Sequence, residues 1–180
     1  HYGCPHTCVF CNQNHSTNRD SLPDANDINS IVHTHLKNKK KSVTHVELAF
    51  FGGSFTGLDI SLQKMYLERA QQLMQKKYIN AIRLSTRPDF ISEDTMKMLL
   101  HYNVNTVEIG AQSFDEIVLK KSNRGHSALD IFRARQLLSA SKINTVIQLM
   151  PGLAGANYKS DMDSCKKAIA LKPSGVRIYP

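Results

Sequence analysis

Three of the four cysteines in this chain lie close together near its start. Cys4, Cys8 and Cys11 have the spacing C-x3-C-x2-C within the segment GCPHTCVFCNQ at Gly3–Gln13. Three thiolates at this spacing can each bind one iron of a cubane 4Fe-4S cluster, which leaves the fourth iron without a protein ligand. Because an iron with an open position can bind and polarise a substrate or cofactor, the segment predicts a reactive cluster.

A zinc site is the alternative for the same cysteines, with His6 as the fourth ligand. Zinc motifs usually contain two separated pairs of ligands, and no second pair follows in this chain. The remaining cysteine, Cys165, stands alone in a helical pattern beside Met162 and Ala168, so it is expected to be a core thiol. This uneven distribution indicates a ligand set in a reducing compartment, whereas a secreted disulfide framework would spread its cysteines over the chain.

Length, composition and charge limit the function classes. With 180 residues, 41% of them hydrophobic, the chain can form one well-cored domain, and we expect that domain to span residues 1–180 as a fragment of a longer protein. No apolar run approaches the roughly 20 residues that cross a bilayer, so no membrane partner and a cytoplasmic location are expected. The net charge of +8 is compatible with an anionic partner such as RNA. The basic run Lys37–Lys41 is predicted to be a solvated loop.

Strand-like and helix-like segments alternate along the rest of the chain, and the helix pattern that starts at Ser92 begins with a residue suited to an N-cap. The apolar spacing predicts strands at His45–Phe51, Ala81–Thr86, Thr106–Ser113, Asn144–Met150 and Gly175–Pro180, and helices at Ile60–Lys77, Ser92–His101, Ala128–Ala140 and Lys159–Leu171.

This alternation predicts an α/β fold with parallel strands and right-handed crossovers. A full eight-unit barrel takes about 250 residues, so the chain holds nearly six units. We therefore expect a parallel (β/α)6-type partial TIM barrel that lacks its first strand and its last helix. The spacing alone leaves an open doubly wound sheet as an alternative. In both folds the reactive residues lie in the loops at the carboxyl ends of the strands.

The cysteine segment and five later segments together resemble one protein family. An aromatic residue precedes the last cysteine, and the segments FFGGSFTGL, STRPDFI, VEIGAQSFDEIVLKKSNRGHS, QLMPGLAG and VRIYP follow in order at the predicted strand ends. This arrangement resembles the radical S-adenosylmethionine (SAM) superfamily, and within it the group of the Elongator catalytic subunit and the oxygen-independent coproporphyrinogen oxidases. The resemblance implies a 4Fe-4S cluster, SAM as cofactor, a flavodoxin- or ferredoxin-type electron donor, and a 5′-deoxyadenosyl radical that abstracts hydrogen from a substrate.

The resemblance also implies roles for residues near the first strand ends. Phe10 would lie against the adenine, although an aromatic residue in a cysteine loop can also simply shield the cluster. Gly52, Gly53 and Ser54 would form a turn against the methionine end of SAM, with an ordinary strand-to-helix turn as the alternative. Glycines suit that position because they let the backbone approach a ligand closely. Many relatives have an acidic residue or threonine in place of Ser54, which leaves its role open. Ser85 stands where relatives use a glutamate on the ribose, and serine brings no charge to that contact.

Further positions on the later strands match the family pattern. Gln112 resembles the glutamine that reaches the ribose, and Arg124 resembles the arginine that reaches the SAM carboxylate, a group that guanidinium can bind with two hydrogen bonds. Gln148 stands where relatives carry an aspartate that binds ribose hydroxyls, although a buried glutamine could instead bond backbone groups. Arg87 is either a surface residue or a ligand contact. The histidines outside the first loop show no ligand spacing and receive no role.

The substrate stays open at the level of sequence. The Elongator-like resemblance and the basic charge favour a tRNA uridine, whereas the coproporphyrinogen oxidase resemblance favours a small anionic molecule such as a porphyrinogen. The competing class is a non-catalytic iron–sulfur or zinc-binding module. Substrate identity usually resides in parts appended to such a core, so the core alone does not discriminate between these substrates.

Overall fold

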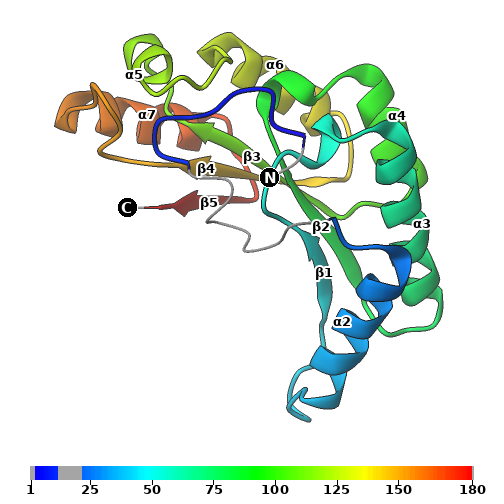
Figure 1. Ribbon diagram of the computed structural model, residues 1–180. Helices are drawn as coiled ribbons and strands as arrows, with labels where there is room; N and C mark the ends of the chain where they lie inside the picture. The colour runs from blue at the N-terminus through cyan, green and yellow to red at the C-terminus, as the bar shows by residue number, and fades with distance from the viewer. Residues whose placement is uncertain (1–2, 12–21, 180) are drawn as a thin grey trace.

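The computed structural model of the chain describes residues 3–11 and 22–179. The last two residues of the cysteine segment and the final residue of the predicted Gly175–Pro180 strand lie outside these ranges. The described strands form one parallel sheet in the order β1-β2-β3-β4-β5 (Figure 1). Their bounds are Glu47–Phe50 (β1), Ala81–Thr86 (β2), Thr106–Gln112 (β3), Asn144–Leu149 (β4) and Gly175–Ile178 (β5).

Helix α2 precedes β1 and the later helices connect successive strands, and the long helices lie on one face of the twisted sheet (Figure 1). No described helix has both the length and the apolar character needed to cross a membrane. The α-helices are Ala25–Lys37 (α2), Ile60–Gln75 (α3), Glu93–His101 (α4), Glu116–Lys121 (α5), Ala128–Ser139 (α6) and Tyr158–Ala170 (α7), and two 3₁₀ turns are Phe55–Gly57 (η1) and Pro88–Phe90 (η2).

This architecture confirms the expected α/β fold of the partial-barrel type. A doubly wound sheet reverses its strand order at a switch point, whereas these five strands follow one another in sequence order. The predicted strands and helices all occur, with ends that move by at most two residues, and β2 has the predicted bounds Ala81–Thr86. Helices α2 and α5 had no predicted range. The lysines of the Lys37–Lys41 run are exposed, as expected for a solvated loop.

Short polar side chains determine where several helices begin. Ser92 caps α4, and its hydroxyl accepts a hydrogen bond from the backbone nitrogen of Thr95 at 3.2 Å, as its N-cap prediction requires. Ser127 and Asp130 form a capping box at the start of α6, in which each side chain bonds the backbone of the other residue. This cap stabilises the first turn of α6 immediately after a loop that contributes to the candidate site.

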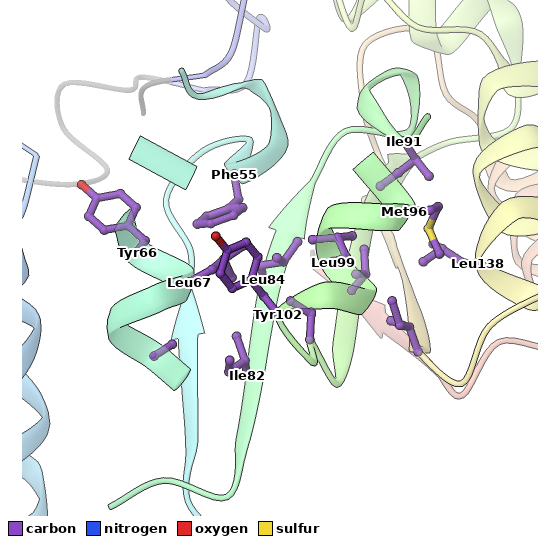
Figure 2. Packing of buried hydrophobic residues seen from close by; sticks show 14 of the residues in the cluster. Phe55, Tyr66, Leu67, Ile82, Leu84, Ile91, Met96, Leu99, Tyr102 and Leu138 are labelled. Carbon is purple, nitrogen blue, oxygen red and sulfur yellow. The ribbon is translucent and has the colours of Figure 1, made fainter. Parts of the chain in front are cut away.

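The hydrophobic core lies between the helices and one face of the sheet. Leu67 of α3 packs with Ile82 and Leu84 of β2, and these three side chains are fully buried (Figure 2). A smaller core group lies between β3, β4, α6 and α7, and Cys165 packs against it as the expected core thiol. Burial of these apolar side chains is the main favourable term in the stability of the fold.

The opposite face of the sheet carries a network of charges. Glu108 of β3 is 1% exposed, and its Oε1 accepts hydrogen bonds from Arg83 of β2 and Arg177 of β5, both at 2.9 Å. Arg83 also donates to Glu47 of β1 at 2.7 Å. The guanidinium of Arg177 lies 5.5 Å from the ring centre of Phe51, just after β1. Since β1 and β5 are the two outer strands, this contact shows that the sheet curves toward a barrel.

Replacing Glu108 with Gln should destabilise the fold by about 1.5–3 kcal/mol, because hydrogen bonds to charged groups are worth this much and two of them converge on Glu108. Urea unfolding monitored by circular dichroism measures this change. Glu47→Gln is the matched control, since Glu47 is more exposed and its pair with Arg83 should contribute less than about 1 kcal/mol. Equal decreases in the free energy of unfolding for the two substitutions would contradict the larger contribution expected from the buried carboxylate of Glu108.

Candidate functional site

The cysteine loop is anchored at two places beyond the carboxyl ends of the strands. The backbone nitrogen of Val9 donates to the carbonyl of Ser122 at 3.2 Å, and the Asn123 side chain donates to the carbonyl of Thr7 at 2.7 Å. At its other end, Gly3 packs so closely against the turn after β1 that a side chain would collide with the carbonyl oxygen of Ser54. The loop therefore spans from the turn after β1 to the segment after α5.

The three predicted cysteine ligands lie near one another on this loop. Cys8 is buried, whereas Cys4 and Cys11 are half-buried. Burial raises the pKa of the Cys11 thiol, the proximity of Cys8 and Cys4 raises it further, and the positive charge of Arg124 opposes the increase. The Arg124 guanidinium also donates a hydrogen bond from Nη1 to the Cys8 sulfur at 3.3 Å. A positive charge thus faces the loop, but it does not outweigh burial, and the pKa of Cys11 lies above its ordinary value.

The zinc alternative requires His6 beside the cysteines. In the structure, the His6 ring packs against Gly125, where a side chain would collide with it. Across residues 3–11 and 22–179, no group of three or more His, Cys, Asp or Glu side chains is arranged to hold a metal ion, and because this includes the three cysteines the finding does not discriminate between a zinc site and an iron–sulfur cluster.

The glycine turn after β1 is held by the next strand. Gly52 has φ +107°, a backbone conformation that glycine adopts readily. The Ser85 hydroxyl donates to the carbonyl of Gly53 at 3.2 Å. Ser54 is buried, and its hydroxyl lies 3.0 Å from that of Thr86. The side chains of Ser54 and Ser85 therefore bond the protein itself, and the turn exposes mainly glycine backbone.

Gln112 lies at an irregularity at the end of β3. It has φ +66°, and the pairing of β3 with β4 shifts between Gly110 and Gln112, so β3 contains one extra residue. The Gln112 side chain turns back toward Gly110 and accepts a hydrogen bond from Gln148 of β4 at 3.4 Å. The two glutamines predicted to bind ribose are therefore neighbours, and Gln148 bonds a side chain rather than the backbone.

Arg124 connects this irregularity with the cysteine loop. Its side chain is buried, and Nη2 donates to the carbonyl of Gly110 at 2.7 Å. The guanidinium carbon lies 5.9 Å from the centre of the Phe10 ring, within the range of a cation–π interaction. Among the described residues, the buried Nε of Arg124 has no hydrogen-bond partner. The guanidinium has five N–H donors and its hydrogen bonds to Cys8 and Gly110 use two of them, so donors remain for a ligand.

Arg87 is a second buried arginine in this region. Arg87 is 3% exposed and donates two hydrogen bonds to Asp89, each 3.0 Å long, so the surface interpretation of Arg87 is wrong. The buried imidazole of His126 is nearby. Burial, together with the charges of Arg124 and Arg87, lowers the pKa of His126 to about 3. His126 is therefore neutral at physiological pH.

The predicted site residues fall into two groups at the two anchors of the cysteine loop. One group contains the glycine turn and Ser85, and the other contains Phe10, Gln112, Arg124 and Gln148. Reasoning from the sequence missed His126 and the charge network of Glu108, Arg83 and Arg177. This network lies on the sheet face opposite the helices, which we call the inner face. The period-two pattern of Thr106–Ser113 could have indicated that Glu108 faces away from the helices. No sequence signal marks His126.

Comparison with known proteins shows which family most of the chain resembles. A model of the radical SAM superfamily matches residues 1–168. The tRNA uridine(34) acetyltransferase of Methanocaldococcus infernus is 31% identical over 155 residues, which cover 75% of this chain and 29% of that protein. Elongator complex protein 3 of Homo sapiens is 25% identical over 165 residues, covering 81% and 30% of the two chains. The aligned part therefore spans less than a third of these relatives.

Solved structures agree with this similarity. The structure titled as the archaeal Methanocaldococcus infernus Elp3 with an N-terminal deletion superposes with a TM-score of 0.74 at 28% identity and covers 87% of this chain and 41% of that one. Coproporphyrinogen III oxidase (HemN) from Escherichia coli superposes with a TM-score of 0.63 at 20% identity, covering 96% and 41%. At that identity the second structure shows a shared fold alone.

Proposed function

Because this chain belongs to the radical SAM superfamily, whose enzymes use a 4Fe-4S cluster and SAM, we propose that Cys4, Cys8 and Cys11 bind the cluster here. The observation that carries the proposal is an anchored loop that bears the three thiols beside the buried guanidinium of Arg124. This donor set suits the cluster chemically, since each of three thiolates can bind a different iron and the fourth iron is then left without a protein ligand. The His6 ring packs against Gly125, and a cubane held by three thiolates does not require His6 as a further ligand.

The residues around the loop also fit SAM. We assign the methionine end of SAM to the glycine turn Gly52–Ser54 and to Arg124, whose unpartnered Nε can donate to a carboxylate. Gln112 and Gln148 would bind the ribose hydroxyls, and Phe10 would stack on the adenine. Ser85 would act indirectly, because its hydroxyl already holds the carbonyl of Gly53.

The chemistry depends mainly on the bound groups. When bound on Cys4, Cys8 and Cys11, the cluster would supply the one-electron reduction that cleaves the S–C5′ bond of SAM and so provides for hydrogen abstraction from a substrate. The residues of this chain bind and orient SAM and shield it from water. An electron donor of the flavodoxin or ferredoxin type would reduce the cluster.

The test is product formation in the absence of any substrate. After anaerobic reconstitution and reduction with dithionite, the protein should convert SAM slowly into 5′-deoxyadenosine, because cleavage needs only the cluster and bound SAM. Chromatography of the products measures this conversion. A protein with intact cluster and bound SAM but no cleavage would support the alternative of a structural iron–sulfur module.

The same assay can identify the substrate class. We propose a tRNA uridine as substrate, since the chain is 31% identical to a tRNA uridine(34) acetyltransferase and has a net charge of +8. A tRNA substrate also fits the expected cytoplasmic location. In the complete protein, added tRNA should increase the rate of 5′-deoxyadenosine formation, whereas a porphyrinogen should leave it unchanged. The opposite result would favour the small anionic substrate.

A further inference from the structure

His126 is a buried neutral donor that points at the backbone of β3. Its Nε2 lies 3.2 Å from the carbonyl oxygen of Ala111. A carbonyl oxygen only accepts hydrogen bonds, so Nε2 of the neutral ring must carry the hydrogen. Because burial keeps the ring neutral, its tautomer is fixed by this one contact. His126 thus holds a single backbone carbonyl by a hydrogen bond that needs no charge.

The carbonyl of Ala111 closes an unusual turn. It also accepts a hydrogen bond from the backbone nitrogen of Ser113 at 2.8 Å, which forms a three-residue turn around Gln112. A turn of this kind with φ +66° at a residue other than glycine is rare and strained. Such a conformation persists only where the surrounding structure holds it.

Ala111 and Gln112 lie on opposite faces of the sheet, as consecutive residues of a strand do. Ala111 is fully buried in the smaller core group, whereas the side chain of Gln112 reaches Gln148 and Gly110 on the inner face. In a strand with regular dihedrals, the pairing of Gln112 with the buried Leu149 would direct both residues to the same face. The extra residue lets Gln112 pair with Leu149 and still keep the face that alternation gives it, and the strained turn sets the backbone conformation from which its amide leaves the strand.

The two residues that precede His126 contact the irregular end of β3 and the cysteine loop. Arg124 donates to the carbonyl of Gly110, one residue before Ala111. Gly125, with φ +73°, lets the backbone pack against the His6 ring of the cysteine loop. Three consecutive residues thus contact both the cysteine loop and two successive carbonyls of the β3 irregularity.

We propose that His126 is a positioning residue for SAM, because it holds the Ala111 carbonyl and so keeps Gln112 in the conformation that presents its amide to the ribose. His126 does not itself touch SAM. The inference rests on the proposed function, in which Gln112 binds SAM.

Equilibrium titration of SAM into the complete, reconstituted protein tests the proposal, with iron content matched between variants. Gln112→Ala should weaken SAM binding about tenfold, as expected for loss of one or two neutral hydrogen bonds. His126→Leu should cause a similar loss. If His126 acts through Gln112, the double variant should bind no more weakly than either single variant.

Two conservative variants distinguish positioning from simple packing. His126→Gln has an amide nitrogen that can reach the Ala111 carbonyl, and it should bind SAM within about twofold of the wild type. His126→Asn is too short and should behave like His126→Leu. Ser122→Ala is the matched control, because the Ser122 side chain is buried after α5 and its hydroxyl has no partner within the described ranges. This control should bind SAM normally.

Three results would overturn the proposal. Unchanged SAM affinity in both His126→Leu and His126→Asn would show that the turn needs no support from His126. Losses that multiply in the double variant would show that His126 acts independently of Gln112. A wild-type protein that carries the cluster but binds no SAM would overturn the proposed function together with this inference, and that outcome is distinct from the first two.

Discussion

Replacing Cys4, Cys8 or Cys11 with Ala is expected to abolish the iron–sulfur cluster and SAM cleavage with it. The reconstituted wild type should be brown and contain about four irons per chain, because three thiolates suffice to hold a cubane. Each single variant removes one of three ligands, and the described part of the chain places no further cysteine on this loop. Iron and labile-sulfide analysis, together with the visible absorption spectrum, measures the loss.

The controls for this experiment are Cys165→Ala and His6→Ala. Cys165 packs against the smaller core group, far along the chain from the loop, and the His6 ring packs against Gly125. Both variants should therefore retain the colour and the iron. Stoichiometric zinc without sulfide in the wild type, or loss of metal in His6→Ala, would instead support the zinc alternative.

The second large effect is expected from Arg124. Arg124→Ala should weaken SAM binding about ten- to a hundredfold, because a hydrogen bond to a charged group contributes roughly 1.5–3 kcal/mol. Arg124→Lys should recover only part of this affinity, since an ammonium group cannot form the paired contact with a carboxylate. SAM titration of each variant measures the change.

The structure adds a requirement to the Arg124 experiment. The same guanidinium bonds the Cys8 sulfur and the Gly110 carbonyl, so its removal can also disturb the cluster. Iron content must therefore be equal in all variants compared. Lys120 and Lys121 are exposed in the nearby α5 and serve as controls for general positive charge. Equal losses of SAM affinity from the lysine and Arg124 substitutions would mean that the general positive charge of this region, and not a specific contact of Arg124, determines binding.

Much of the fold follows from local signals in the sequence. The segment Ala81–Thr86 forms β2 with the predicted bounds, and Ser92 caps α4 as its residue type predicts. Such signals depend on neighbouring residues, because side-chain periodicity and capping act within one or two turns. The short α5 was missed because six residues give too little periodicity to recognise.

The candidate site, like the fold, was predicted from the sequence only in part. The spacing of Cys4, Cys8 and Cys11 by itself predicts a set of metal ligands, since residues so close in sequence must share one loop. The family resemblance added Gln112 and Arg124. How these side chains are held could not be read from the sequence, because their partners come from distant segments: Arg124 bonds Cys8, which lies 116 positions away.

Tertiary structure alone decided which polar residues are buried and what they hold. Arg87 before a proline could equally have been a surface residue, and only the packing of η2 shows it buried with Asp89. The positive φ of Gln112 and the contact of His126 with Ala111 likewise arise from the packing of β3 against the loop that precedes α6. Burial makes a polar side chain costly unless it finds a partner, and such partners are determined by the folded chain as a whole.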